Sequence, residues 1–342
     1  MAKLLIGCYS YDSYEEYGTA PNAVITRLRT AVQELEAKRS SYAAQLETDN
    51  AFQAIFVAPE YLFTRANATK SREPMSKQLS EDVVRDLKAI SEAFPRILMF
   101  PGSIFYRESL AVDVNYQKMQ AHLIAAELNM AGRGATEVIS QPRKAGGVTI
   151  PSLKEGSEAL KGGLKPDSYR AYNSVRAFLG GESVMTPYNK QWDFKETEGA
   201  DVQKLVFVPG SAKGTREIRE FTFGIEVCFD HGNGALKGHN PNVDIHVVVS
   251  DWVENKEGNM AMKNGGYFVH ASSESVQTCV YSRNNMGGLQ KLNRTAGQLK
   301  AFEMAYWLVD IDRRRLDQVE RIVPAGAPVL VNNKAIIGKK VM

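Results

Sequence analysis

The stretch TFGIEVCFDHGNG, residues 222–234, is the most informative part of the chain. β-Branched and aromatic residues alternate from Phe221 to Val227, which predicts a strand that ends at Cys228. Asp230 and a glycine-rich turn follow. A thiol at the point where a strand gives way to such a turn can have the exposed sulfur and the nearby backbone N–H groups that a nucleophile needs. The alternative is a buried strand cysteine that acts as a small apolar residue.

Composition places the chain among ordinary globular proteins. It has 342 residues, of which 44% are hydrophobic and 24% charged, and this length is ample for a large core. A net charge of +3 is too small to predict a nucleic-acid partner. No apolar run approaches the roughly 18 residues of a membrane span. The N-terminus reaches a tyrosine and an aspartate too soon for a signal peptide, so we expect no membrane partner.

The cysteines and histidines indicate neither a disulfide framework nor a metal site. Cys8, Cys228 and Cys279 are an odd and sparse set, which favours a reduced, cytoplasmic setting. Cys8 and Cys279 lie in apolar or strand-like segments and are expected in the core. The five histidines show no metal-ligand spacing. His246 and His270 lie within apolar strands, where hydrogen-bonded core or pocket-wall groups are expected.

The first hundred residues alternate between strand and helix patterns, which is typical of an α/β sheet covered by helices. The expected strands are Leu4–Tyr9, Ala54–Ala58 and Ile97–Phe105, and the expected helices are Pro21–Leu46 and a second one that Ser80 caps and Phe94 ends. Further strands follow from Tyr169 onward. No repeat and no composition shift marks a boundary, so a single domain over residues 1–342 is predicted.

Residues 108–167 interrupt this rhythm. The segment from Gly132 to Lys165 contains seven glycines and several basic residues. We interpret it as a long insertion into the domain. Long loops inside compact domains are usually functional lids or disordered segments, and a solvated surface excursion is the alternative.

Three chemically complementary residues each follow a predicted strand or hairpin: Glu60, Lys190 and Cys228. The carboxylate can take the thiol proton, the ammonium can hold developing oxyanion charge, and the thiolate can attack. A nearby cation also lowers a thiol pKa. The set suits acyl transfer if the three side chains converge in the folded protein.

The segments around these residues resemble the nitrilase, or carbon–nitrogen hydrolase, superfamily. Its pattern is a Pro-Glu after an early strand, a Tyr-x-Lys after a hairpin, and a Gly-x-x-x-Cys-x-Asp strand end. The chain carries these pieces in order at Pro59–Tyr61, Tyr188–Lys190 and Gly224–Asp230. Supporting matches lie at Pro101–Ile104, Tyr172–Val175, Ser250–Trp252 and Leu308–Asp312.

The resemblance implies a four-layer α-β-β-α sandwich with the three residues at one end of the sheets. It implies that Glu60 is a general base, that Lys190 stabilises the tetrahedral species and that Cys228 is the nucleophile. The backbone N–H of Phe229 would be a second oxyanion donor. The implied reaction passes through a thioester, releases ammonia or an amine, and needs no metal and no organic cofactor.

The resemblance extends to further residues and to partners. A second glutamate shortly after the lysine is implied; Glu198 is the candidate and Glu196 its rival, although either can be a solvated loop charge. Tyr61 and Trp252 are expected beside the substrate, although a tryptophan there can simply pack. The implied partners are a small-molecule amide and further copies of the chain, as a homodimer or higher homo-oligomer.

The chain also departs from the family pattern. Gly232 stands where the family commonly has an arginine, and Trp192 where it often has a histidine. Phe229 and Asp230 replace the Trp-Glu of true nitrilases, which favours an amide over a nitrile. Three functions are therefore weighed: an amidohydrolase acting on a small linear amide or carbamoyl compound, a catalytically inactive binding or scaffold protein with the same fold, and an acyltransferase that uses the same thioester.

Overall fold

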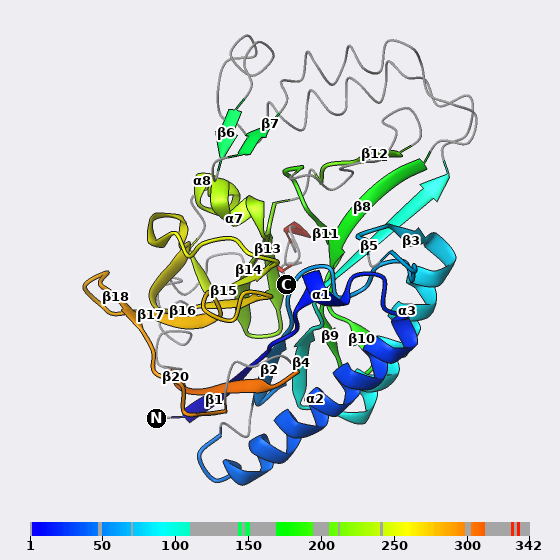
Figure 1. Cartoon of the computed structure of the whole chain (residues 1–342). Coiled ribbons are helices and arrows are strands. Elements are labelled where there is room, and N and C mark those ends of the chain that lie inside the picture. The colour runs from blue at the N-terminus through cyan, green and yellow to red at the C-terminus, as the bar shows by residue number, and fades with distance from the viewer. Residues whose placement is uncertain are drawn as a thin grey trace, which may run out of the picture.

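Two mixed β-sheets packed face to face form the centre of the protein (Figure 1). The computed structural model describes residues 2–46, 50–69, 71–109, 143–145, 148–150, 169–193, 205–210, 213–239, 242–297, 302–311, 330–331 and 334–335. Helices and strands are mixed along the chain, so the predicted α/β class is confirmed.

A seven-stranded sheet has the N-terminal strand near its centre. Its strands lie in the order β10 (Glu182–Ser183), β9 (Phe178–Leu179), β4 (Ile97–Phe100), β2 (Ala54–Val57), β1 (Ala2–Tyr9), β20 (Met304–Ile311) and β19 (Ala296–Gly297). The strands β1, β2 and β4 are parallel, and β20 runs antiparallel to β1. The carboxyl ends of the three parallel strands therefore meet at one edge.

A six-stranded sheet repeats this plan with a parallel centre. Its strands lie in the order β13 (Thr215–Ile218), β14 (Phe221–Val227), β15 (Val243–Ser250), β16 (Met262–Ser272), β17 (Cys279–Arg283) and β18 (Leu289–Lys291). The strands β14, β15 and β16 are parallel, and the flanking strands are antiparallel. Its parallel strands also end at one edge.

A third sheet is smaller. The chain passes into it directly from the seven-stranded sheet, from β4 to β5. It contains β11 (Tyr188–Asn189), β8 (Tyr169–Val175), β5 (Ser103–Ser109) and β3 (Met75–Ser76), with β12 (Leu205–Phe207) beside β8. Two hairpins stand apart from these sheets: β6 (Arg143–Ala145) with β7 (Val148–Ile150), and β21 (Leu330–Val331) with β22 (Lys334–Ala335).

The main core lies between the two large sheets. Ile6 and Cys8 of β1 and Phe223, Ile225 and Val227 of β14 are fully buried in one cluster. Their spacing of two residues is the strand period, which places alternate side chains on one face. The prediction that Cys8 belongs to the core is confirmed.

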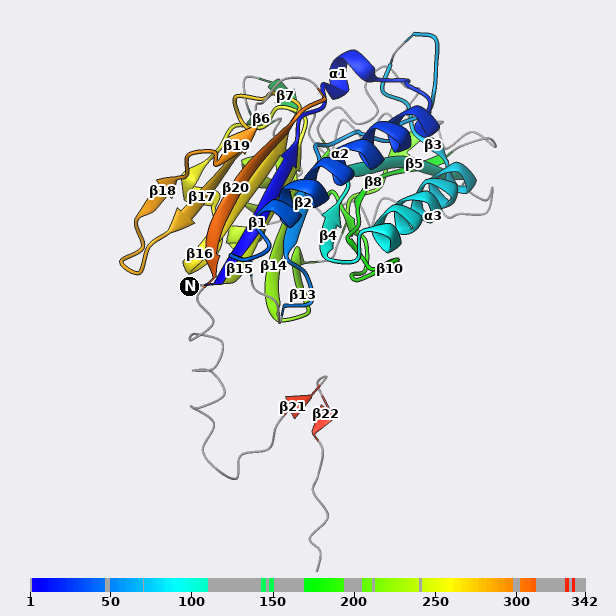
Figure 2. The same ribbon diagram turned by 90° about the horizontal axis from the view of Figure 1, so that it is seen from below.

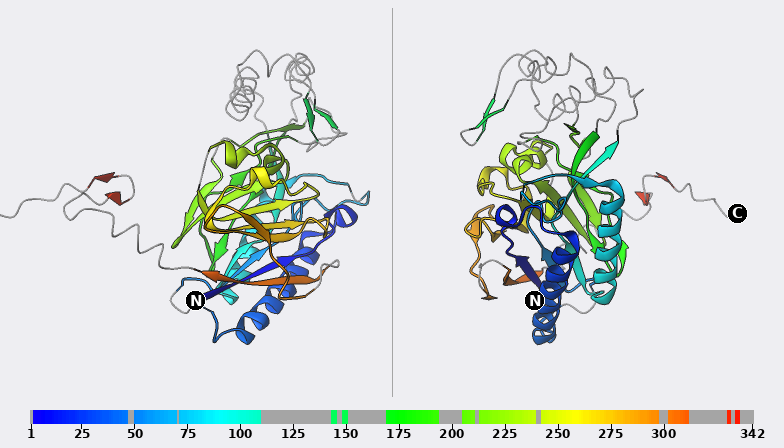
Figure 3. Two further views of the ribbon diagram at one scale, coloured as in Figure 1. Left: turned by 90° about the vertical axis from the view of Figure 1, so that its left-hand side faces the viewer. Right: turned by 45° about the vertical axis from the view of Figure 1, so that its right-hand side comes forward.

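Two long helices, α2 (Pro21–Ser41) and α3 (Lys77–Ala93), cover the other face of the seven-stranded sheet (Figure 2). Leu28 of α2 and Leu87 of α3 share a buried cluster with Leu5 and Phe56 of the sheet. Two further views show the helices side by side on this face (Figure 3). They form the outer α layer that the sequence predicts.

The outer face of the six-stranded sheet is covered differently. The described residues there form short helices, α7 (Phe229–Asn233), α8 (Ala235–Gly238) and the 3-10 turn η2 (Glu257–Asn259). Met260 packs with Val248 and Phe268 of the sheet in a third buried cluster. Another short helix, α1 (Ser13–Glu16), follows β1. Three of the four predicted layers are thus regular, and short helices and loops occupy the fourth position.

Several local predictions are wrong, and the helix expected over Pro21–Leu46 ends at Ser41. The predicted strand Ile97–Phe105 is broken at Gly102, whose φ of 81° favours glycine, and its halves β4 and β5 join different sheets. The helix α3 begins before Ser80, because the Ser76 side chain accepts a hydrogen bond from the N–H of Leu79 at 3.2 Å. Several small polar residues there compete for the cap, and sequence cannot rank them.

The predicted insertion, residues 108–167, lies largely outside the described residues, and the single-domain boundary stays a prediction. Among the helices that the structure describes, none combines the length and apolar character needed to cross a membrane.

Phe223 tests the packing between the sheets. Its ring lies 5.5 Å from that of Phe100 and 6.3 Å from that of Phe52, measured between centroids. Phe223→Ala is expected to lower the free energy of unfolding by about 3–5 kcal/mol, through lost burial and a residual cavity. Val276→Ala, at a 71% exposed side chain, is the control and should change it by about 0.5 kcal/mol or less. Urea unfolding measures both, and equal losses would contradict the assignment of this core.

Candidate active site

The three predicted catalytic residues lie at strand ends from all three larger sheets. Glu60 lies three residues after β2, Lys190 directly follows β11, and Cys228 directly follows β14. Their side chains are buried, with exposed fractions of 0%, 1% and 4%. Because β14 and β15 are parallel, Asp251 after β15 reaches the same edge as Cys228. Residues 130 positions apart along the chain, such as Glu60 and Lys190, therefore become neighbours.

The Glu60 carboxylate is held through both oxygens. Its Oε1 accepts hydrogen bonds from Lys190 Nζ at 2.9 Å and from Asn173 Nδ2 at 2.7 Å. Its Oε2 accepts one from the backbone N–H of Asp251 at 3.1 Å. Donors on both oxygens and a cation are what a buried carboxylate needs to stay ionised. The acid and the ammonium are thus fixed in one orientation.

Cys228 has a strained backbone. Its φ of 47° and ψ of −105° lie outside the favoured regions for a residue with a Cβ atom. Its N–H donates to the carbonyl of Val249 at 2.9 Å, and its carbonyl accepts from the N–H of His231 at 3.0 Å. The prediction of a glycine-rich turn after Cys228 is wrong, because the short helices α7 and α8 form there. Phe229 is the first residue of α7, where backbone N–H groups point out of the helix.

The electrostatic surroundings of the thiol include both charged partners. Burial raises the pKa of the Cys228 thiol well above its ordinary value, and the Glu60 charge raises it further. The Lys190 charge and a hydrogen bond from the Asp251 backbone act in the opposite direction. The charges of Glu60 and Lys190 therefore act on the thiol in opposite directions.

Asp230 connects the cysteine segment to the lysine segment. Its carboxylate accepts hydrogen bonds from Tyr188 Oη at 2.9 Å and from the backbone N–H groups of Gln191 and Trp192 at 3.1 and 2.9 Å. Burial raises the pKa of Asp230 to about 7, against the Lys190 charge and these hydrogen bonds. Because the donors flank Lys190, Asp230 fixes the backbone from which the ammonium projects.

Tyr61, predicted beside the substrate, packs near the lysine. Its φ is 55°, and its N–H donates to Ser103 Oγ at 2.9 Å. Its ring meets those of Tyr17 and Phe105 edge-on, and Lys190 Nζ lies 5.6 Å from its centroid. Tyr61 therefore forms one wall beside the ammonium.

Trp252, the other aromatic predicted beside the substrate, directly follows Asp251. Its side chain is 42% exposed, whereas Asp251 is 6% exposed and accepts a hydrogen bond from Tyr17 Oη at 2.6 Å. Trp252 thus lies at the solvent boundary, one residue from the buried cluster.

The remaining predicted residues divide into two groups. Glu198 and its rival Glu196 lie in residues 194–204, outside the described residues, so the second glutamate stays a prediction. The contacts of Asn173, Asp230 and Asp251 were not predicted. All three lie within the motif matches, and that position was the one sequence signal that pointed to them.

His231, His246 and His270 are buried core groups, as predicted for the last two. His270 contacts Ser250 Oγ through Nε2 at 2.6 Å and Asn255 Oδ1 through Nδ1 at 2.8 Å. His246 is also fully buried and hydrogen-bonded. The sequence spacing missed one cluster, because the fold brings His231, His246 and Glu226 together with their ligand-type atoms within 4.8 Å of one another.

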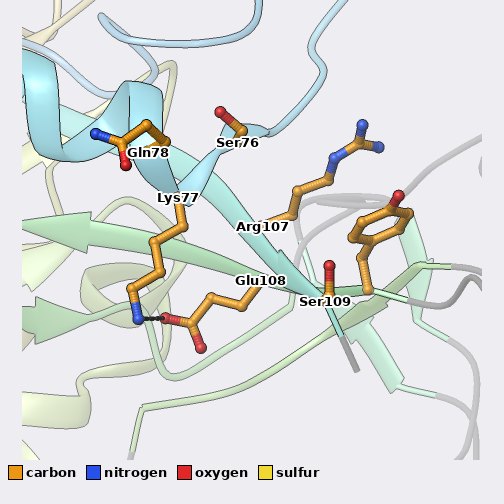
Figure 4. Close-up of a pocket in the computed structure, with 7 residues that line it drawn as sticks. Ser76, Lys77, Gln78, Arg107, Glu108 and Ser109 are labelled. Carbon is orange, nitrogen blue, oxygen red and sulfur yellow. Dashed lines mark ion pairs between the residues drawn. The ribbon is translucent and has the colours of Figure 1, made fainter. Parts of the chain in front are cut away.

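A surface hollow of about 520 Å³ is lined by residues of β3, α3, β5 and β8 (Figure 4). Lys77 and Glu108 form an ion pair at 3.0 Å within it, and the Arg107 guanidinium lies 4.3 Å from the Tyr169 ring centroid. These residues sit toward the far end of β5 from Ser103. The hollow is therefore distinct from the site around Cys228.

Solved structures similar to this chain come from the nitrilase superfamily. One is a branch 10 member from Saccharomyces cerevisiae, 12% identical over 95% of this chain and 96% of that chain, with a TM-score of 0.47. Another is a carbon–nitrogen hydrolase from Helicobacter pylori G27, with 13% identity, 94% coverage of both chains and a TM-score of 0.45. A third is an amidase from Nesterenkonia sp., with 10% identity, coverage of 93% and 97%, and a TM-score of 0.43.

No protein-family model and no curated protein sequence matches the chain. The structural neighbours belong to the superfamily that the sequence motifs resemble.

The Glu60–Lys190 pair makes a prediction about stability. Lys190→Met should lower the free energy of unfolding by about 3–5 kcal/mol, because a buried carboxylate loses its cation. The double variant Glu60→Gln/Lys190→Met should lose clearly less than the sum of the two single variants. Urea unfolding measures the cycle, with Lys237→Met at an exposed position as the control. Additive losses would show that the pair is not coupled.

A second prediction concerns the pH dependence of Cys228 alkylation. Because the Glu60 charge raises the pKa of Cys228 and the Lys190 charge lowers it, the two single variants should act in opposite directions. Glu60→Gln should move the alkylation of Cys228 by iodoacetamide to lower pH, and Lys190→Met should move it to higher pH. Intact mass follows the rate, with Cys228→Ala reporting background labelling. Shifts in the same direction would contradict this electrostatic account.

Proposed function

We propose that this protein is a cysteine-dependent hydrolase of a non-peptide carbon–nitrogen bond in a small linear amide or carbamoyl compound. The observation that carries the proposal is the buried ion pair of Lys190 and Glu60 beside the Cys228 thiol. The ordered sequence motifs favour the same class. Among the structural neighbours, one is named as an amidase and another as a carbon–nitrogen hydrolase.

The first step of the proposed reaction is attack by sulfur. The thiol is neutral, so a base must remove its proton as the S–C bond forms. Glu60 is the carboxylate beside it, and it takes the proton. The carbonyl π electrons move onto oxygen, where Lys190 Nζ and the backbone N–H of Phe229 stabilise the negative charge.

The second step breaks the carbon–nitrogen bond. The proton on Glu60 passes to the leaving nitrogen, ammonia or an amine departs, and a thioester on Cys228 remains. Water then attacks the thioester while Glu60 accepts its proton, and collapse of this intermediate releases the acid and returns the proton to the sulfur. Glu198 is the proposed second glutamate.

The proposal extends to assembly and setting. We infer a homodimer or higher homo-oligomer and a cytoplasmic setting from the sequence. Light scattering coupled to size exclusion tests the first, and localisation of the tagged full chain tests the second.

An amide panel tests the reaction. The native protein should release ammonia from at least one small linear amide or carbamoyl compound, and Cys228→Ala should reduce release to background because no thioester can form. Cys279→Ala is the matched control, since this buried thiol packs in another cluster. Intact mass should show an acyl adduct on Cys228.

Three outcomes decide between the alternatives. Native activity in Cys228→Ala would exclude the cysteine mechanism. Transfer of the acyl group to an added primary amine without release of the free acid would indicate an acyltransferase. A native protein without any adduct or turnover would favour the binding protein.

A further inference from the structure

A second buried polar cluster lies directly beneath the nucleophile. Glu226 precedes Cys228 by two residues in β14, and His231 follows it by three residues in α7. His231 Nδ1 and His246 Nε2 each lie 2.9 Å from Glu226 Oε2. All three side chains are fully buried. None of them belongs to the acid–lysine–thiol set.

The hydrogen bonds fix the charge and the proton positions. Burial raises the pKa of Glu226, but the hydrogen bonds from His231 and His246 outweigh it and lower the pKa to about 2. Glu226 Oε1 also accepts from the Leu236 N–H at 2.7 Å. His246 Nδ1 accepts from the Ala261 N–H at 3.2 Å, so its proton is on Nε2 and points at Glu226. Glu226 is thus an ionised acceptor with three donors.

The same contacts argue against a metal ion, although the three atoms lie close enough to hold one. A metal-bound histidine usually donates its other ring N–H to an acceptor. Here His246 Nδ1 accepts from a backbone N–H, so a metal on Nε2 would require both ring nitrogens to lack protons. His231 Nε2 has no hydrogen-bond partner among the described residues either. Both histidines instead serve as hydrogen-bond donors to the Glu226 carboxylate.

The cluster includes residues on both sides of the strained Cys228 along the chain. Glu226 anchors the strand before Cys228, and the His231 side chain anchors the helix after it to the same carboxylate. The backbone N–H of His231 donates to the Cys228 carbonyl at 3.0 Å, and Asn259 Nδ2 donates to the His231 carbonyl at 2.7 Å. A strained conformation persists only where its surroundings over-determine it. These contacts do so at Cys228.

We propose that Glu226, His231 and His246 form a metal-free clamp that holds Cys228 in its strained conformation, with His231 as a positioning residue for the sulfur. The clamp sets the place of the thiol relative to Glu60 and Lys190. The effect on turnover rests on the proposed hydrolase function, whereas the effect on thiol chemistry does not. The two readouts can therefore fail separately.

The test uses matched substitutions at one position. His231→Asn keeps an N–H donor close to the place of Nδ1, His231→Gln moves the donor outward by one bond, and His231→Leu removes it. His239→Leu is the control, because this exposed histidine ends α8 in the same segment. Circular dichroism and thermal melting establish that each full-length variant is folded. If the Leu variant does not fold, the Asn and Gln pair decides.

The first readout is the pH profile of Cys228 alkylation by iodoacetamide, which needs no substrate. In His231→Leu and His231→Gln, the midpoint should move by about one pH unit or more, as the sulfur leaves its place beside the two charges. It should stay at the native value in His231→Asn and His239→Leu. Native profiles in folded Leu and Gln variants would overturn the clamp, whether or not the protein hydrolyses amides.

The second readout is amide turnover. For His231→Leu and His231→Gln, kcat should fall by about tenfold to a hundredfold, because a small misplacement of a reacting atom costs that much. KM should change little, and His231→Asn should recover most of the loss. Metal analysis of the native protein completes the test: one bound metal ion per chain that His231→Leu loses would overturn the metal-free assignment.

Discussion

The buried ion pair between Glu60 and Lys190 is the constraint on which the structure depends. Two charges taken out of water destabilise a fold unless good geometry and further hydrogen bonds compensate for the lost hydration. Asn173 and the Asp251 backbone supply those bonds. The four residues come from three sheets, so satisfying one carboxylate fixes where the sheets meet. The ion pair therefore lies where the ends of strands from all three sheets come together.

Carboxylates on both sides of Cys228 in sequence hold it in different directions. Glu226 links the segment before Cys228 to His231 and His246, and Asp230 links the segment after it to the backbone that carries Lys190. Asp230 finds its partners in Tyr188 and two backbone N–H groups. The unusual His231 is part of the arrangement beneath.

Sequence reasoning was reliable where the signal is local and strongly patterned. The strand Phe221–Val227 ends where predicted, because alternating side chains over seven residues are typical of a strand with one face in the core. It failed where several local solutions are nearly equal. Ser76 rather than Ser80 caps α3, and the segment after Cys228 is helical despite its glycines. Glycine permits a turn without requiring one, and tertiary contacts decide such cases.

The sequence by itself determined the α/β class, the core strands and the identity of an acid, an ammonium and a thiol at strand ends. These are encoded in residue type and periodicity, which neighbours along the chain can report. Only the tertiary structure decided that Glu60 and Lys190 pair, that Asn173 and Asp251 complete the acid site, and that Glu226 is hydrogen-bonded to two histidines. Such contacts join positions up to 191 residues apart, and they arise from burial, because each polar group taken from water must find a partner wherever the packed sheets provide one.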